Sequence, residues 1–325
     1  MSRLTIEAPA KINLHLRVKK LRPDGFHDLE SIFLALRFGD TLIFELLEGE
    51  ERLEIRCPLP GFGATEILPP EKNIIFRAVS LFREKTGCRQ GLRVHVEKRI
   101  PPGGGLGGGS SNAASSLLAL NALCGMSLGK AALLEMAAFL GSDVPFFLAE
   151  TGAAWAAGRG EDLLPLEYPQ KPAIVLVNPG FPSTTAGAFR LLDQYRRDGG
   201  PDSKPADFSD LKPLNKDQPF LIEALSGNPR NWPYENDFLR VFLEAGEKGG
   251  GNQALAEQAA AYRRILLRLD ELGADFSSLS GSGSTCFGVF SNQKKAEKAE
   301  KFLLKDWNFV KLTFPLARRA NTVLK

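Results

Sequence analysis

The first fifty residues alternate apolar and polar side chains in the manner of paired strands. The alternation runs through Thr5–Ile6 and Ala10–Val18, and the turn residues Arg22-Pro23-Asp24-Gly25 then interrupt it. A second extended region, Asp28–Leu47, is rich in β-branched and aromatic residues and contains a Gly-Asp pair. We expect this region to form two strands that separate at the Gly-Asp pair.

Helical spacing of apolar residues follows in Asn73–Lys85. Its apolar positions are 74, 75, 79, 81 and 82, and the glycine at 87 predicts where the helix ends. Leu92–Ile100 alternates again and predicts a strand. The residues of Ala113–Leu123 and Leu128–Leu140 favour helix and predict two more helices.

The second half of the chain mixes strands and helices without strict alternation. Ala173–Val177 is an apolar run ended by Asn-Pro-Gly, which predicts a buried strand, and Gln253–Leu272 predicts a long helix. Phe276–Pro315 predicts a strand, a glycine loop, a strand, a helix and a last strand. Arg196–Asn236 is rich in Pro, Gly, Asp and Lys, and we expect a partly ordered loop with short helices. This order favours an α+β fold over a doubly wound sheet.

Composition narrows the class of protein. A length of 325 residues suggests two domains, and an apolar content of 43% excludes a mainly disordered chain. The net charge is only +3, without a basic block, so we expect neither nucleic acid nor an anionic membrane as a partner. The N-terminus does not resemble a signal or transit peptide, and no apolar run approaches the roughly 18 residues of a membrane span. We therefore expect a soluble, cytoplasmic protein.

The cysteines and histidines give no metal signal. The four cysteines lie far apart, with no CxxC pair and no histidine at ligand spacing. We expect neither structural zinc nor a disulfide framework. His15 and His95 are interpreted as structural residues.

The segment 101–112, PPGGGLGGGSSN, carries the main chemical signal. Six of the seven residues at 103–109 are glycine, which leaves successive backbone N–H groups free to approach phosphate oxygens. A helix opening at Ser110–Ser111 would add the positive end of its dipole, and the two hydroxyls can cap the helix or bind phosphate or metal. A flexible linker is the alternative, but linkers do not usually join a strong strand to a strong helix.

The glycine-rich segment does not match the two common phosphate-binding motifs, the P-loop and the dinucleotide-binding motif. No G-x-x-x-x-G-K-[ST] string occurs, so the site is not a P-loop. Gly103, Gly105 and Gly108 satisfy G-x-G-x-x-G only formally, because two prolines separate them from the preceding strand and no acidic residue ends a strand about 20 residues on. A nicotinamide oxidoreductase is therefore a weak alternative.

Two charged residues stand out in unusual surroundings. Asp143 lies in the string SDVP, where the following proline biases Val144 towards an extended backbone and marks a helix start. A helix N-cap is the structural interpretation of this carboxylate. Lys11 lies in an alternating apolar strand, where a solvated lysine is the simple interpretation, and Asn13 lies on the same face of that strand.

Three segments together resemble the GHMP kinases, the superfamily of galactokinase, homoserine kinase, mevalonate kinase and phosphomevalonate kinase. They are Pro9–Leu14 (PAKINL), Pro101–Ala114 and Leu279–Phe287 (LSGSGSTCF), in the family's order along the chain. The resemblance implies an N-terminal half like ribosomal protein S5 domain 2 and a ferredoxin-like C-terminal half. It further implies an ATP-binding catalytic domain over 1–165 and a substrate-side domain over 166–325.

Further strings narrow the expected reaction. Asp24–Phe33 (DGFHDLESIF), Gly141–Phe147 (GSDVPFF) and Glu235–Phe238 (ENDF) resemble the branch of the superfamily that acts on a cytidine diphosphate-linked methylerythritol. That branch phosphorylates the 2-hydroxyl with ATP in non-mevalonate isoprenoid synthesis, and magnesium is expected with ATP. A GHMP kinase for another small alcohol and a non-catalytic nucleotide-binding homologue are the alternatives. The oligomeric state is not predicted.

The resemblance also implies roles at the substrate side. Asp143 is the expected base for the substrate hydroxyl, Lys11 pairs with it, and Asn13 binds substrate. The remaining substrate-side residues are His27 against the cytosine, Phe26 and Phe189 stacked on the base, and Thr185 at the diphosphate. Ordinary core packing is the alternative for either phenylalanine, and an exposed turn is the alternative for the histidine.

The nucleotide-binding residues that the resemblance implies are Asn73 and Lys98 near the adenine, and Pro102, Gly103, Gly104, Gly105, Leu106, Gly107, Gly108, Gly109, Ser110, Ser111 and Asn112 around the phosphates. No cluster of carboxylates marks a dedicated metal site. The segment Gly281–Ser284 is expected to close over the transferred phosphate or the substrate, with a tight turn between strands as the alternative.

Overall fold

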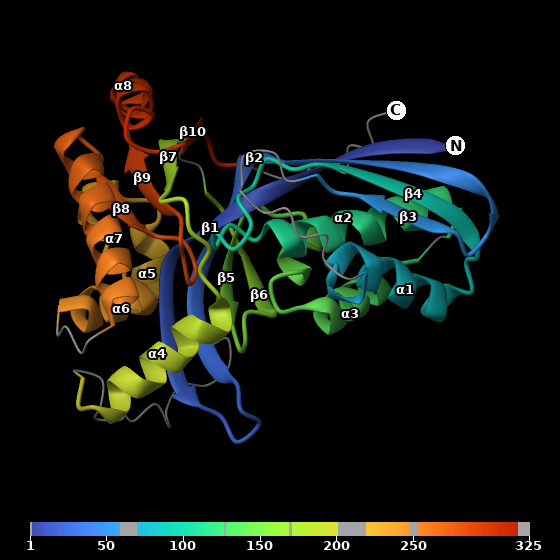
Figure 1. Cartoon of the computed structure of the whole chain (residues 1–325), viewed down its shortest axis with the longest axis horizontal. Helices are drawn as coiled ribbons and strands as arrows, with labels where there is room; N and C mark the ends of the chain where they lie inside the picture. Colours follow the sequence, from blue (N-terminus) through green and yellow to red (C-terminus); the bar gives the residue numbers. More distant parts are fainter. Residues whose placement is uncertain are drawn as a thin grey trace.

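Two lobes share two long strands. The computed structural model describes residues 2–58, 70–126, 128–168, 171–200, 219–247 and 252–317. Strands β1 (Arg3–Leu21) and β2 (His27–Glu50) pair antiparallel and run through both lobes (Figure 1). The turn between them closes where Gly25 N donates to Arg22 O at 3.0 Å. The predicted paired strands and their turn are confirmed.

The first lobe is built on a six-stranded sheet. Its order is β3-β4-β2-β5-β6, with β1 paired to β2, and only the β3–β4 pair is parallel. The added strands are β3 (Leu53–Arg56), β4 (Gln90–Glu97), β5 (Ala153–Ala157) and β6 (Asp162–Leu166). The strand predicted over 92–100 is confirmed as β4 with shifted ends. The other three were not predicted, because each has at most five residues and β5 is mostly alanine.

Three helices cover one face of that sheet. They are α1 (Ile74–Thr86), α2 (Gly108–Leu123) and α3 (Lys130–Leu140), and they pack on the sheet through one apolar core (Figure 1). Asn73 caps α1 by accepting from Ile75 N at 2.9 Å, and the helix ends at Gly87, whose φ is 70°. The three predicted helices are confirmed, although α2 begins at Gly108 rather than at Ser110.

The second lobe packs helices on a four-stranded antiparallel sheet. The sheet order is β10-β7-β9-β8, with β7 (Ala173–Asn178), β8 (Phe276–Leu279), β9 (Cys286–Phe290) and β10 (Phe309–Thr313). The helices are α4 (Thr185–Arg197), α5 (Pro219–Ala224), α6 (Asp237–Glu247), α7 (Gln253–Glu271) and α8 (Gln293–Leu303). Three short 3₁₀ segments complete the described elements, at Pro70–Lys72, Pro145–Leu148 and Pro229–Asn231.

The mixture of two sheets and separate helices confirms the α+β expectation. The predicted strands and helices of the second lobe are confirmed, but α4 and α6 were not predicted. Part of the loop predicted over 196–236 lies outside the described residues, and its described part contains α5 and a 3₁₀ turn. Within the described ranges, no helix has the length and apolar character needed to cross a membrane.

The predicted break of β2 at its Gly-Asp pair is wrong. The strand continues through Gly39 and Asp40, but its pairing with β1 shifts register, since Pro9 faces Gly39 whereas Lys11 faces Ala35. A Cβ on Gly39 would overlap the carbonyl of Ala8. The glycine therefore marks a bulge at which two backbones come close, and not the end of a strand.

The expectation about cysteines also needs correction. Cys88 and Cys124 form a disulfide that links the end of α1 to the end of α2 across 36 residues of sequence. The two helices pack side by side, so their C-terminal ends bring two thiols together that the sequence spacing does not pair. Cys57 and Cys286 are free.

We expect Gly39→Ala to destabilise the protein by about 1–3 kcal/mol, because the added methyl group forces two strands apart at the bulge. Urea unfolding followed by circular dichroism measures the change. Gly129→Ala is the matched control, because a Cβ there meets nothing within 4 Å. Equal stabilities for the two variants would contradict this account of the bulge.

Candidate active site

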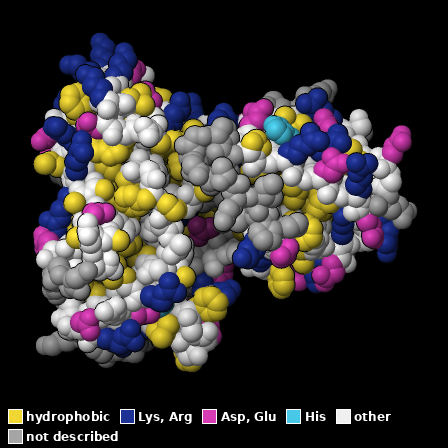
Figure 2. Space-filling view, in the orientation of Figure 1, with side chains coloured by type: hydrophobic (Ala, Val, Ile, Leu, Met, Phe, Trp, Pro, Cys, Tyr) yellow, Lys and Arg dark blue, Asp and Glu magenta, His cyan; other side chains and the backbone are white. Residues whose placement is uncertain are grey.

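One large cavity lies where the two lobes meet. Its volume is about 1170 Å³, and Figure 2 shows the surface hollowed between the lobes on this face. The lining comes from β1, the start of α1, the glycine-rich segment, the start of α4 and the loop that precedes β9. Segments far apart in sequence therefore meet around a single space large enough for two sizeable ligands.

The glycine-rich segment takes a fixed path that needs its glycines. Gly103, Gly105 and Gly107 all have positive φ, at 63°, 73° and 69°. A Cβ on Gly107 would lie 2.9 Å from Lys11 Cγ, and one on Gly105 would overlap the carbonyl of Ser280. The segment is thus a packed loop ending at the N-terminus of α2, and the linker alternative is wrong.

The C-terminal glycine motif holds this loop from the other side. Ser284 N donates to Gly103 O at 3.3 Å and Thr285 N to Gly104 O at 3.1 Å. Ser280 Oγ donates to Gly105 O at 2.8 Å. The motif is a turn between β8 and β9, as the structural alternative had it, and it is also a wall of the cavity.

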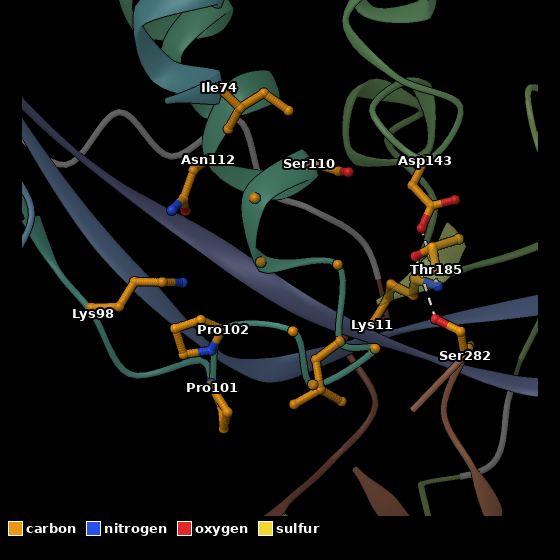
Figure 3. Close-up of a pocket in the computed structure, with 18 of the residues that line it drawn as sticks. Lys11, Ile74, Lys98, Pro101, Pro102, Ser110, Asn112, Asp143, Thr185 and Ser282 are labelled. Atoms are coloured by element: carbon orange, nitrogen blue, oxygen red, sulfur yellow. Dashed lines mark hydrogen bonds and ion pairs between the residues drawn. The ribbon is translucent and has the colours of Figure 1, made fainter. Parts of the chain in front are cut away.

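Lys11 and Asp143 meet at the cavity. Lys11 Nζ lies 3.2 Å from Asp143 Oδ2, and their side chains are 5% and 32% exposed. The same ammonium donates to Asn13 Oδ1 at 2.7 Å, and Asn13 Nδ2 donates to Ser31 Oγ at 2.8 Å. Figure 3 shows the pair beside Thr185 and Ser282, on the opposite side of the glycine loop from Lys98. A buried lysine held in this way is not the solvated strand lysine of the alternative interpretation.

The backbone around Asp143 differs from the sequence expectation. Val144 is helical, at φ −65° and ψ −41°, and not extended, because its N–H donates to Gly141 O in a turn that the proline bias did not override. No side chain caps the following 3₁₀ turn, so Asp143 is not an N-cap. Its carboxylate is turned to Lys11 instead.

At the other end of the cavity, Lys98 is fixed by a buried acid. Asp40 is fully buried, and its carboxylate accepts from Lys98 Nζ at 2.5 Å and from the backbone N–H groups of Arg99 and Ile100 at 2.8 Å each. Lys98 and Asn73 both line the cavity. Asp40 carries no signal in the sequence beyond the Gly-Asp pair, which predicted a strand break.

Two buried polar atoms near the start of α2 lack hydrogen-bond partners in the described part of the chain. Ser111 Oγ and Asn112 Oδ1 are buried and have no hydrogen-bond partner among the described residues. Gly107 occupies the N-cap position of α2 and no side chain caps the helix, so of the two alternatives for the serines, helix capping is wrong. Buried oxygen atoms without hydrogen-bond partners, next to a loop that can surround a phosphate group, are typical of a ligand site.

The predicted base-binding residues are only partly brought together. His27 stacks on Phe189, with ring centroids 4.9 Å apart, and its Nε2 lies 2.9 Å from Asp193 Oδ1. Phe26 is 52% exposed, and its ring lies against the Arg159 guanidinium at 5.0 Å. The described lining of the cavity includes Phe189 but not Phe26, His27 or Ser111. The other predicted site residues line the cavity.

Several polar residues of the site were missed by sequence reasoning. Asp193 follows Phe189 by one helical turn on α4, so the spacing would have revealed it had that helix been predicted. Ser282 Oγ lies 3.3 Å from Thr185 Oγ1, and Ser183 Oγ donates to the carbonyl of Ser282 at 2.7 Å. These contacts arise from tertiary packing, although the LSGSGS string already marked the loop.

No group of three or more His, Cys, Asp or Glu side chains in the described part of the chain has the arrangement of a metal site.

Comparison with protein families places both halves of the chain in one superfamily. Residues 73–151 match the GHMP kinases N terminal domain, and residues 240–308 match the GHMP kinases C terminal family. The two matches contain the glycine-rich loop, Asp143, and the loop that precedes β9.

Full-length relatives agree with this placement. A 4-diphosphocytidyl-2-C-methyl-D-erythritol kinase of Thermodesulfovibrio yellowstonii is 34% identical over 94% of this chain and 95% of its own length. One of Treponema pallidum is 35% identical over 94% of this chain and 97% of its own. The described fold is similar to the crystal structure of a 4-(cytidine 5'-diphospho)-2C-methyl-D-erythritol kinase, with a TM-score of 0.70, 32% identity and coverage of 96% and 99%. Leishmania major mevalonate kinase shares the fold at a TM-score of 0.66, 16% identity and 97% coverage of each chain.

We expect the buried His15, on the same strand as Lys11, to lower the free energy of unfolding at acidic pH. Burial, and secondarily the charge of Arg17, lowers the pKa of His15 from 6.5 to about 4. The unfolded chain therefore binds a proton first, and stability falls as the pH drops from about 6.5 to 4, by up to about 3 kcal/mol. His15 Nδ1 accepts from Glu235 N at 3.2 Å, an acceptor role that the amide oxygen in His15→Asn retains.

Urea unfolding at several pH values tests this expectation. The stability of His15→Asn should fall less than that of the wild type across that pH window, whatever its stability at pH 7. Parallel curves for the two proteins would show that His15 is not the group that titrates.

Proposed function

The chain belongs to the 4-diphosphocytidyl-2-C-methyl-D-erythritol kinase family of the GHMP kinases, which are ATP-dependent, and on this premise we propose how its cavity carries out the reaction. The chain is a kinase that transfers phosphate from ATP to the 2-hydroxyl of 4-diphosphocytidyl-2-C-methyl-D-erythritol in isoprenoid precursor synthesis. One observation carries the assignment of roles: the Lys11–Asp143 pair, at 3.2 Å, opens onto the cavity walled by both glycine loops.

At the acceptor end, Asp143 takes the proton of the substrate hydroxyl. The hydroxyl oxygen forms a bond to the γ-phosphorus while the bond from that phosphorus to the β,γ-bridging oxygen breaks, and ADP leaves with the electron pair. Lys11 holds and orients the carboxylate through the ion pair, and Asn13 binds substrate. The ion pair supplies the acid–base step without a covalent enzyme intermediate.

At the nucleotide end, Asn73 and Lys98 lie near the adenine, and Pro102–Asn112 surround the phosphates. The support for this arrangement is that Pro102–Ser110 and Asn112 line the cavity and that the loop ends at the N-terminus of α2. The Asp40 carboxylate holds Lys98 in place. The C-terminal loop Gly281–Ser284 contacts the transferred phosphoryl group from the other side of the cavity.

Magnesium fits beside the triphosphate. Ser111 Oγ and Asn112 Oδ1 are buried oxygen atoms that lack partners among the described residues, and hard cations bind such neutral oxygens together with phosphate and water. Of the two, Asn112 lines the cavity and would hold the ion directly or through water. When bound, the ion neutralises charge on the transferring phosphoryl group.

At the substrate's far end, Phe189 and His27 form the cytosine subsite, with Thr185 at the diphosphate. The support is the stacked pair of rings next to the cavity and the position of Thr185 on its wall. Phe26, exposed beside Arg159, is the second residue proposed to stack on the base. We retain the division into an ATP-binding domain over 1–165 and a substrate-side domain over 166–325, which fits the extent of the two sheets.

ADP release with Mg-ATP tests the substrate and the base together. We expect turnover with the cytidine substrate and none with mevalonate, homoserine or galactose. Asp143→Ala should lower kcat by about 100- to 10,000-fold, because the hydroxyl loses its proton acceptor. Asp270→Ala, an exposed carboxylate on α7, is the control and should retain wild-type turnover.

The possible failures of this assay differ in meaning. Turnover of another alcohol would keep the kinase and refute the substrate. Bound ATP without any turnover would favour a non-catalytic homologue. Full activity of Asp143→Ala would refute only the role of the carboxylate.

We further expect Asp193 to position the histidine of the base subsite. A carboxylate only accepts hydrogen bonds, so His27 Nε2 donates to it and the ring is held against Phe189. Asp193→Ala removes this acceptor and should raise KM for the cytidine substrate about tenfold, the worth of roughly 1.4 kcal/mol. KM for ATP should not change. Asp198→Ala, at the end of the same helix, is the control, and an equal effect of both variants would contradict this role.

A further inference from the structure

Asn236 makes more hydrogen bonds than a helix cap requires. Its side chain is 5% exposed and lies just before α6. Nδ2 donates to Leu279 O at 2.8 Å and to Gly281 O at 2.9 Å, so both N–H groups are used. Oδ1 accepts from Leu239 N at 3.0 Å and caps the helix. One amide therefore joins α6 to the C-terminal glycine loop.

Two other asparagines show what capping alone looks like. Asn252 Oδ1 accepts from Leu255 N and Asn292 Oδ1 accepts from Lys295 N, each at 3.2 Å, at the starts of α7 and α8. Both caps lie at the exposed surface. Across the described ranges, the side-chain hydrogen bonds of these two residues are the capping ones, whereas Asn236 also binds two carbonyl groups of a loop in the active-site wall.

The segment that contains Asn236 is hydrogen-bonded to β1, the strand that carries Lys11. Leu16 N donates to Glu235 O at 2.8 Å, and Leu16 forms a parallel bridge with Asn236. Lys11 and Asn13 lie on the same strand, a few residues earlier. The segment around Asn236 therefore connects β1, which carries Lys11, to the C-terminal glycine loop in the cavity wall.

The two carbonyl groups that Asn236 holds flank the tightest part of that loop. Ser280, between them, donates to Gly105 O at 2.8 Å. A Cβ on Gly281 would lie 3.2 Å from Gly105 O and 3.4 Å from Asn13 Oδ1, and Gly281, Ser282 and Gly283 line the cavity. Small shifts of the held carbonyls would therefore move Gly281, Ser282 and Gly283 in the wall of the cavity.

We propose that Asn236 is a positioning residue for phosphoryl transfer, which fixes the loop Leu279–Gly283 in its active arrangement through two donated hydrogen bonds. The inference rests on the proposed function, in which this loop contacts the transferred phosphoryl group. A loop held in advance costs no ordering during the reaction, so the hydrogen bonds lower the barrier rather than strengthen substrate binding. Asn236 itself does not touch the substrate.

Asn236→Ser is the principal test, because serine keeps an oxygen for the helix cap and lacks both amide donors. We expect kcat to fall roughly 10- to 100-fold, as two hydrogen bonds are lost. KM for the cytidine substrate should stay within about threefold, because the base subsite is intact. Asn252→Ser replaces a cap without touching the loop and should keep wild-type kcat.

Asn236→Asp is the second variant. It keeps the shape and the capping oxygen but points a carboxylate oxygen at two carbonyl oxygens, so kcat should fall at least as far as in Asn236→Ser. Thermal unfolding is measured for each variant, and kcat is expressed per folded molecule. A merely structural role predicts a loss of activity that follows the folded fraction, and that result would overturn the proposal.

The remaining outcomes are also decisive. A kcat that stays within fivefold of the wild type in both variants, or an effect confined to KM, would refute the positioning role. Equal losses in Asn236→Ser and Asn252→Ser would reduce it to helix capping. Wild-type protein that fails to phosphorylate the cytidine substrate would refute the proposed function, which is a separate result read from the wild type alone.

Discussion

The close approach of two glycine loops is the constraint on which the cavity depends. Gly105 lies so near the backbone of Ser280 that no side chain fits between them, and hydrogen bonds from Ser284 and Thr285 fasten the two loops together. One loop belongs to the first lobe and the other to the second. Their contact therefore fixes the lobes around a common space, which residues of both loops line.

The buried ammonium of Lys11 is the second constraint, because an unpaired charge at 5% exposure would be costly. Its neighbours are arranged to meet this cost. Asn13 accepts from the ammonium, Ser31 accepts from Asn13 and donates to the carbonyl of His15, and the Phe33 ring lies 4.7 Å away. This chain of hydrogen bonds runs between two paired strands, so the position of the charge is set by the sheet.

Local sequence signals predicted most helices and the long strands, because their period and end signals are strong, as at Asn73 and Gly87 around α1. They failed at α4 and α6, which lie next to Gly- and Pro-rich stretches, and at Gly39, where a bulge resembles a break. The glycine loop and Asp143 stand out by composition or resemblance. Asp40 and Asp193 do not, because each acts on a residue distant in sequence, and Asn236 lies in the ENDF string but gives no sign there of the loop that it binds. Only tertiary packing reveals such pairs.

The unequal burial of the central ion pair separates two demands on a phosphoryl-transfer site. Lys11, on a paired strand, is nearly inaccessible to solvent, and the strand fixes its position. Asp143, in a short turn, is about one-third exposed, so a substrate can reach its carboxylate. A carboxylate that must meet a substrate hydroxyl has to face the cavity, and a cation that only orients it does not. The strand therefore carries the residue that must not move, and the turn carries the one that must be reached.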